Sequence, residues 1–164
     1  GMMGDDSLLT FDNIDATLYG VDMNWHYRLN EHFKLSGIVS YVKGERDDIN
    51  DDLYRISPLN TRINLLYHYK NWQSNLAVHA YASQDDVSAL NNEQVSAGYA
   101  VVDWQVDYFV SSGLVVRLGA NNLLDKQYND HLGGVNRADG SDIAVGERVT
   151  AMGRNVYLAM DYQF

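Results

Sequence analysis

The sequence predicts an all-β protein, an antiparallel up-and-down meander of seven or eight strands that forms a segment of a transmembrane β-barrel. Three observations support this fold class: a strict apolar/polar alternation, an alternation of short and long connections, and a face rich in ionisable side chains. The last segment shows the alternation, with Val156, Leu158 and Met160 on one face and Tyr157 and Asp161 on the other. A period of two over about ten residues is typical of a strand that has different solvents on its two sides.

Seven segments carry this alternation. In chain order they are residues 15–30, 33–41, 62–70, 73–83, 98–110, 114–122 and 154–164. In the first segment Tyr19, Val21 and Met23 share a face, whereas Asp22 and Asn24 lie on the other; a helix would mix the two sets. Residues 8–14 form a weaker candidate for an eighth strand.

The connections alternate in length along the chain. Short turns near residues 30–32, 70–72 and 111–113 alternate with long polar segments near residues 44–58, 84–97 and 123–153. Outer-membrane barrels have short periplasmic turns and longer extracellular loops. This order therefore indicates a membrane barrel whose carboxy terminus lies on the periplasmic side.

The two faces of the predicted sheet differ in chemistry. Burying even one unpaired charge costs several kcal/mol, so a face with many ionisable groups must meet water. Eight such residues are predicted to face a wet lumen: Asp22, His26, Arg28, Arg62, His68, Asp103, Asp107 and Arg117. The opposite face, which includes Trp25, Val106 and Leu158, is predicted to meet outer-membrane lipid.

Composition excludes several classes of function. A formal charge of −10 argues against nucleic-acid binding, and the absence of cysteine excludes disulfides and thiol chemistry. No run of eighteen apolar residues predicts a transmembrane helix. No catalytic constellation and no cofactor motif is present, so we expect no enzyme. No secretory signal precedes the first strand, so we expect a fragment of a longer protein.

The run LGANNLLDKQY at residues 118–128 resembles the NLFDK-Y signature of TonB-dependent outer-membrane receptors. Residues 130–164 resemble the last loop and terminal strand of that family, and residues 14–29 resemble a family strand in which a Tyr-Gly pair precedes an acidic lumen residue. Asn121 and Asn122, inside this run, are expected to bond to local backbone where the strand ends.

The resemblance implies a Gram-negative outer-membrane receptor with a plugged barrel of about twenty-two strands. Such receptors import metal complexes or other scarce nutrients, energised through TonB. Residues 1–164 would be the carboxy-terminal barrel segment, without the plug domain, the TonB-contacting region and the earlier strands. By itself, this segment is expected to be incompetent for transport.

Ligand-binding candidates lie in the third long loop. They are His131, Arg137, Arg148, Met152 and Arg154. The arginines suit an anionic metal chelate, while His131 and Met152 suit a soft metal such as copper. A hydrated loop with internal ion pairs is the alternative for each residue. The acidic run at residues 45–52 lacks the spacing of a calcium loop, so a solvated loop is favoured there.

Two other functions remain open from the sequence: a small structural or adhesive outer-membrane barrel, and a soluble β-barrel that binds an apolar ligand. Seven strands leave two edges unpaired, so we expect the isolated chain to self-associate through these edges or to close into a smaller form. A monodisperse monomer with free edge strands would contradict this expectation.

Overall fold

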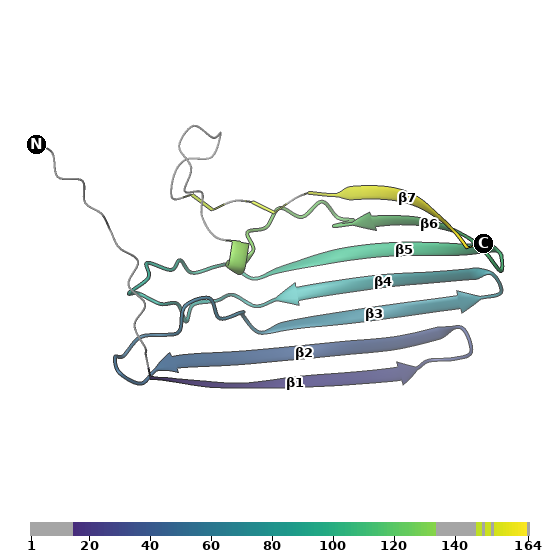
Figure 1. Ribbon diagram of the computed structural model, residues 1–164. Helices are drawn as coiled ribbons and strands as arrows, with labels where there is room; N and C mark the ends of the chain where they lie inside the picture. Colours follow the sequence, from purple (N-terminus) through teal and green to yellow (C-terminus); the bar gives the residue numbers. More distant parts are fainter. Residues whose placement is uncertain (1–14, 134–146, 149, 152, 164) are drawn as a thin grey trace, which may run out of the picture.

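The computed structural model describes residues 15–133, 147–148, 150–151 and 153–163 (Figure 1). These residues form one antiparallel sheet in which every strand lies beside its neighbours in sequence, in the order β1 to β7. The strands are β1 (Ala16–Arg28), β2 (Phe33–Arg46), β3 (Asn60–Tyr69), β4 (Trp72–Tyr81), β5 (Tyr99–Ser111), β6 (Leu114–Asn121) and β7 (Asn155–Tyr162). A short 3-10 turn, η1 (His131–Gly133), follows β6. The predicted up-and-down meander is confirmed.

The short turns lie together at one end of the sheet, and the long connections lie at the other (Figure 1). In the turn between β1 and β2, the side-chain oxygen of Asn30 accepts hydrogen bonds from the backbone N–H groups of His32 and Phe33, at 2.8 and 2.9 Å. The turn between β3 and β4 places Lys70 in the left-handed region, with φ of 48°. These turns reverse the chain within residues 29–32 and residues 70–71.

The strand register separates the polar residues from the apolar ones. Residues that are direct partners across an antiparallel ladder lie on the same face of the sheet. Following these partners from β1 to β6 places all eight predicted lumen residues on one face. On that face Asp107 and Arg117 are partners and form a bidentate ion pair, with N–O distances of 2.9 and 3.1 Å.

The opposite face is apolar and uncovered. Among the described residues, only two hydrophobic residues are buried: Ala77, which lies on the polar face, and Ala120. Large apolar side chains of β7 are open, with Leu158 exposed to 70% and Met160 to 68%. A contiguous apolar surface of this kind marks contact with lipid or with another protein layer. The sheet is thus held together mainly by its ladders and cross-strand pairs.

No helix among the described residues is long and apolar enough to cross a membrane.

Strand β2 is longer than the sequence predicts. Strand β2 runs on to Arg46, because Gly44, Glu45 and Arg46 pair with the start of β1, whereas a loop was predicted from residue 44. The register between β5 and β6 shifts between Phe109 and Ser111. Such a bulge bends the strand where it meets the turn. The candidate eighth strand, residues 8–14, lies outside the described residues.

Candidate functional site at the long-loop end

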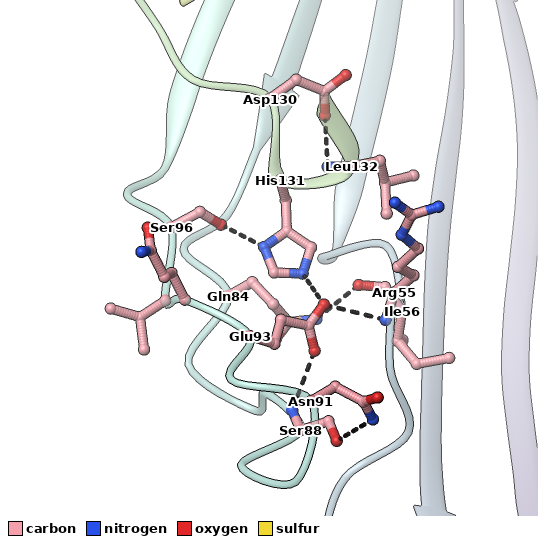
Figure 2. A network of polar contacts seen from close by, with 12 residues as sticks. Arg55, Ile56, Gln84, Ser88, Asn91, Glu93, Ser96, Asp130, His131 and Leu132 are labelled. Carbon is pink, nitrogen blue, oxygen red and sulfur yellow. Dashed lines mark hydrogen bonds and ion pairs between the residues drawn. The ribbon is translucent and has the colours of Figure 1, made fainter. Parts of the chain in front are cut away.

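The three long loops are joined by a polar network around Glu93 and His131 (Figure 2). One oxygen of Glu93 accepts a hydrogen bond from the backbone N–H of Arg55 in the β2–β3 loop, at 3.0 Å. The other accepts from the backbone N–H of Ser88, also at 3.0 Å. Glu93 Oε1 lies 3.2 Å from His131 Nε2, and His131 Nδ1 is hydrogen-bonded to Ser96 Oγ at 2.9 Å. These two side chains therefore link all three loops.

The Glu93–His131 pair is withdrawn from water. The Glu93 side chain is 7% exposed and the His131 side chain 2%. A buried carboxylate is tolerated only when hydrogen bonds or an opposite charge compensate for lost hydration, and Glu93 accepts hydrogen bonds from the backbone N–H groups of Arg55 and Ser88. His131 Nε2 approaches Glu93 Oε1 without hydrogen-bond alignment.

A second link between the first two long loops is centred on Asp51. Its carboxylate accepts hydrogen bonds from the backbone N–H of Ala89 at 2.8 Å and from the hydroxyl of Ser88 at 2.8 Å. The pKa of Asp51 is lowered below its ordinary value, mainly by the hydrogen bond from the Ala89 N–H and next by the hydrogen bond from the Ser88 hydroxyl. A lowered aspartate pKa stabilises the fold at pH values above the ordinary pKa, and that contribution is lost as the pH falls through the lowered one. The link is consequently intact at neutral pH.

A pocket of about 350 Å³ opens on the polar face where the strands reach the long loops. We call it the loop-end pocket. Its lining is His79, Tyr81, Tyr99, Val101, Asp103, Asn121, Asn122, Tyr128, Asp130, Gly153 and Asn155. Strands β4, β5, β6 and β7 and the β6–β7 loop all contribute residues to it.

Three tyrosines form one side of the loop-end pocket. Tyr81 and Tyr99 are direct partners in the β4–β5 ladder, and their ring centroids lie 4.8 Å apart. Tyr128 stacks on Tyr99 with a centroid distance of 4.4 Å. The pKa of Tyr128 is raised above its usual range, mainly by burial and next by the nearby carboxylates of Asp130 and Asp103. The tyrosine stack thus stands beside two negative charges.

Asn122 follows the last residue of β6 and holds the chain there through hydrogen bonds of its side chain and its backbone. Its side chain accepts a hydrogen bond from the Lys126 N–H at 2.9 Å and donates one to the Lys126 carbonyl at 2.8 Å. Its own N–H donates to Asp103 Oδ1 at 2.8 Å. Asn122 and Asp125 both adopt left-handed conformations, with φ of 49° and 54°. The NNLLDK run is thus structural. Asp125 in this run also accepts a hydrogen bond from the Arg154 N–H, and this bond positions the start of β7.

The family of proteins described as "TonB dependent receptor-like, beta-barrel" matches residues 2–123, which is most of the chain. The chain belongs to the TonB-dependent receptor family. This confirms the family that the resemblance implied. Members of this family are outer-membrane transporters of Gram-negative bacteria and not enzymes.

Two solved structures of TonB-dependent receptors are similar to this chain. The copper transporter OprC shares 25% sequence identity, with a TM-score of 0.86 over 93% of this chain. The ferric yersiniabactin uptake receptor FyuA from Yersinia pestis shares 16% identity, with a TM-score of 0.66 over 91% of this chain, and supports the fold alone. The chain spans 24% of the length of each of these proteins. No curated protein sequence matches it.

The predicted ligand-binding residues contact different partners. His131 is enclosed in the loop network. The Arg148 guanidinium donates to the Gln94 side-chain oxygen at 3.3 Å and to the backbone carbonyls of Gln94 and Val95. Arg154 is exposed, and its backbone N–H donates a hydrogen bond to Asp125 Oδ1 at 2.9 Å. Arg137 and Met152 lie outside the described residues.

Sequence reasoning missed Glu93 and the tyrosine stack. A signal for the stack was present, because the alternation places Tyr81 and Tyr99 on the polar face, where tyrosines stand out. Nothing in the sequence distinguishes Glu93 from other loop acids. No group of three or more His, Asp or Glu side chains in the described part of the chain is placed to hold a metal ion.

Proposed function

We propose that this chain is the carboxy-terminal barrel segment of an outer-membrane receptor for the TonB-energised uptake of a metal complex, of siderophore or copper type, or of a similar nutrient. The match of residues 2–123 to the receptor-barrel family is the observation that carries this proposal. The similarity to the copper transporter OprC supports the metal-related class of nutrient.

The two-faced sheet supports a place in the barrel wall. The apolar face, with Trp25, Val106 and Leu158, meets outer-membrane lipid, and the face with the eight ionisable residues lines a water-filled lumen. The long loops form the extracellular mouth. Since Glu93, His131 and Asp51 already join these loops, less ordering is required when a ligand binds.

The remaining parts of the transport cycle belong to regions outside residues 1–164. A plug domain blocks the lumen, and an amino-terminal region contacts TonB. These regions move the plug after ligand binds at the loops and the lumen face. The segment by itself is therefore transport-incompetent, and its edge strands β1 and β7 pair with further barrel strands or, in isolated material, with another copy.

Metal uptake in cells tests this proposal. The genomic reading frame that carries this chain is expressed in a Gram-negative host with and without TonB, and cell-associated metals are measured by mass spectrometry. We expect accumulation above the empty vector only when TonB is present. Residues 1–164 alone are expected to give no accumulation. Equal uptake in the two hosts would contradict the receptor function, and uptake by residues 1–164 alone would contradict their incompetence.

A further inference from the structure

We propose that the loop-end pocket binds a positively charged ligand: a small cation that carries N–H or O–H donors, as either a metal complex or an organic amine. This inference rests on the proposed receptor function and names the charge of its ligand. It sets aside an anionic chelate held by the loop arginines.

The pocket lining carries negative charge that the described residues do not neutralise. Asp103 and Asp130 both line the pocket. Each has one oxygen in a hydrogen bond with a backbone N–H, from Asn122 at 2.8 Å and from Leu132 at 3.1 Å. No ion pair to either carboxylate is present among the described residues, and no lysine or arginine lines the pocket. A bound cation would supply the missing charge.

Two arginines near the pocket, Arg62 and Arg148, have hydrogen-bond partners outside its lining. Arg62 is the cross-strand partner of the pocket residue His79, but its Nε donates to Asn64 Oδ1 at 3.2 Å, toward the turn end of β3. Arg148 is held by the backbone of Gln94 and Val95. Lys126 and Arg148 line a separate pocket that shares Tyr99 and Tyr128 with the first. An anion would therefore find its basic partners in that second pocket.

The loops around the mouth have the same sign as the lining. Residues 45–59 and 82–98 hold eight carboxylates and only two arginines, Arg46 and Arg55. Clustered charge of one sign raises the local concentration of ions of the opposite sign and speeds their association. The mouth consequently attracts cations and repels anions.

The lining favours a cation that brings its own ligands over a bare metal ion. No set of three metal-binding side chains is assembled among the described residues. The side chains of Asn121 and Asn155 and the tyrosine oxygens offer acceptors for N–H or O–H donors. A volume of about 350 Å³ accommodates a small complex or amine.

Ligand titration of the folded chain in detergent micelles tests this inference, with calorimetry as the readout and far-UV circular dichroism as the control for folding. The cationic probes are hexaamminecobalt(III) and spermidine, and the anionic probe is hexacyanoferrate(III). We expect binding of at least one cation and not of the anion. The double variant Asp103→Asn/Asp130→Asn, which keeps both hydrogen-bond acceptors, should weaken cation binding by about tenfold or more.

Asp85→Asn/Asp86→Asn is the matched control, because it removes the same charge from loop residues outside the lining. It should weaken cation binding by less than about threefold. Preference for one cationic probe identifies the ligand as a metal complex or an amine. Binding of hexacyanoferrate(III), binding of no probe, or an equal loss in the two double variants would overturn the inference. TonB-dependent uptake alongside such a result would leave the receptor function standing.

Discussion

Replacing Glu93 by alanine is expected to release the three long loops from one another while the sheet remains paired. The variant removes the acceptor of the Arg55 and Ser88 N–H groups and the carboxylate that lies beside the buried His131 imidazole. Removing one partner of a buried polar pair costs about 3 kcal/mol, because the other groups remain desolvated without a partner. The free energy of local loop opening should fall by this amount, which corresponds to roughly a hundredfold change in the opening equilibrium.

Hydrogen–deuterium exchange measures this opening residue by residue. The amides of Arg55 and Ser88 should exchange roughly a hundred times faster in Glu93→Ala, while amides in the centres of β3 and β4 keep their rates. Asp85→Ala is the matched control, since Asp85 is an exposed acid of the same loop. If Glu93→Ala and Asp85→Ala give the same exchange rates, Glu93 does not hold the loops together.

An added positive charge is expected to have different effects on the two faces of the sheet. Ile63 and Asn64 are neighbours in β3 and lie on opposite faces, with Ile63 beside Gly37 and Val78 and Asn64 beside Ser36 and Ala77. An arginine on the lipid face of a barrel costs about 2–4 kcal/mol near the bilayer midplane, whereas an arginine on a wet face is hydrated. We therefore expect Ile63→Arg to destabilise the chain in a bilayer far more than Asn64→Arg.

Urea unfolding of the two variants in phospholipid vesicles checks this expectation. The free energy of unfolding should fall by about 2–4 kcal/mol in Ile63→Arg and by less than about 1 kcal/mol in Asn64→Arg. The two variants add the same side chain to adjacent residues of one strand, so each serves as the control for the other. Equal losses would show that the two faces meet the same solvent.

The meander could be predicted because its information is local and repeated. A period of two identifies each strand, and the order of short and long connections identifies which strands are adjacent. The extension of β2 to Arg46 escaped this reasoning, because a glycine and charged residues do not alternate. Only pairing with β1 makes these residues a strand, and that pairing is a property of the sheet.

The loop contacts could not be predicted for a different reason. Glu93 and Arg55 are 38 residues apart, and Ser96 and His131 are 35 apart, with no periodic pattern connecting them. The sequence singled out His131 as a ligand-binding candidate because it lies in the third long loop and an imidazole suits a soft metal such as copper. In the structure, Ser96 is hydrogen-bonded to its Nδ1 atom and Glu93 lies 3.2 Å from its Nε2 atom.

A cysteine scan of β5 shows whether opposite faces of the sheet meet lipid and water. The chain has no cysteine, so a spin label placed at each position from 102 to 109 reports one site only. We expect lipid-soluble oxygen to reach labels at Val102, Trp104 and Val106, and a water-soluble nickel complex to reach labels at Asp103 and Gln105, in strict alternation. Equal access of the nickel complex to both sets, or the reverse alternation, would contradict the account.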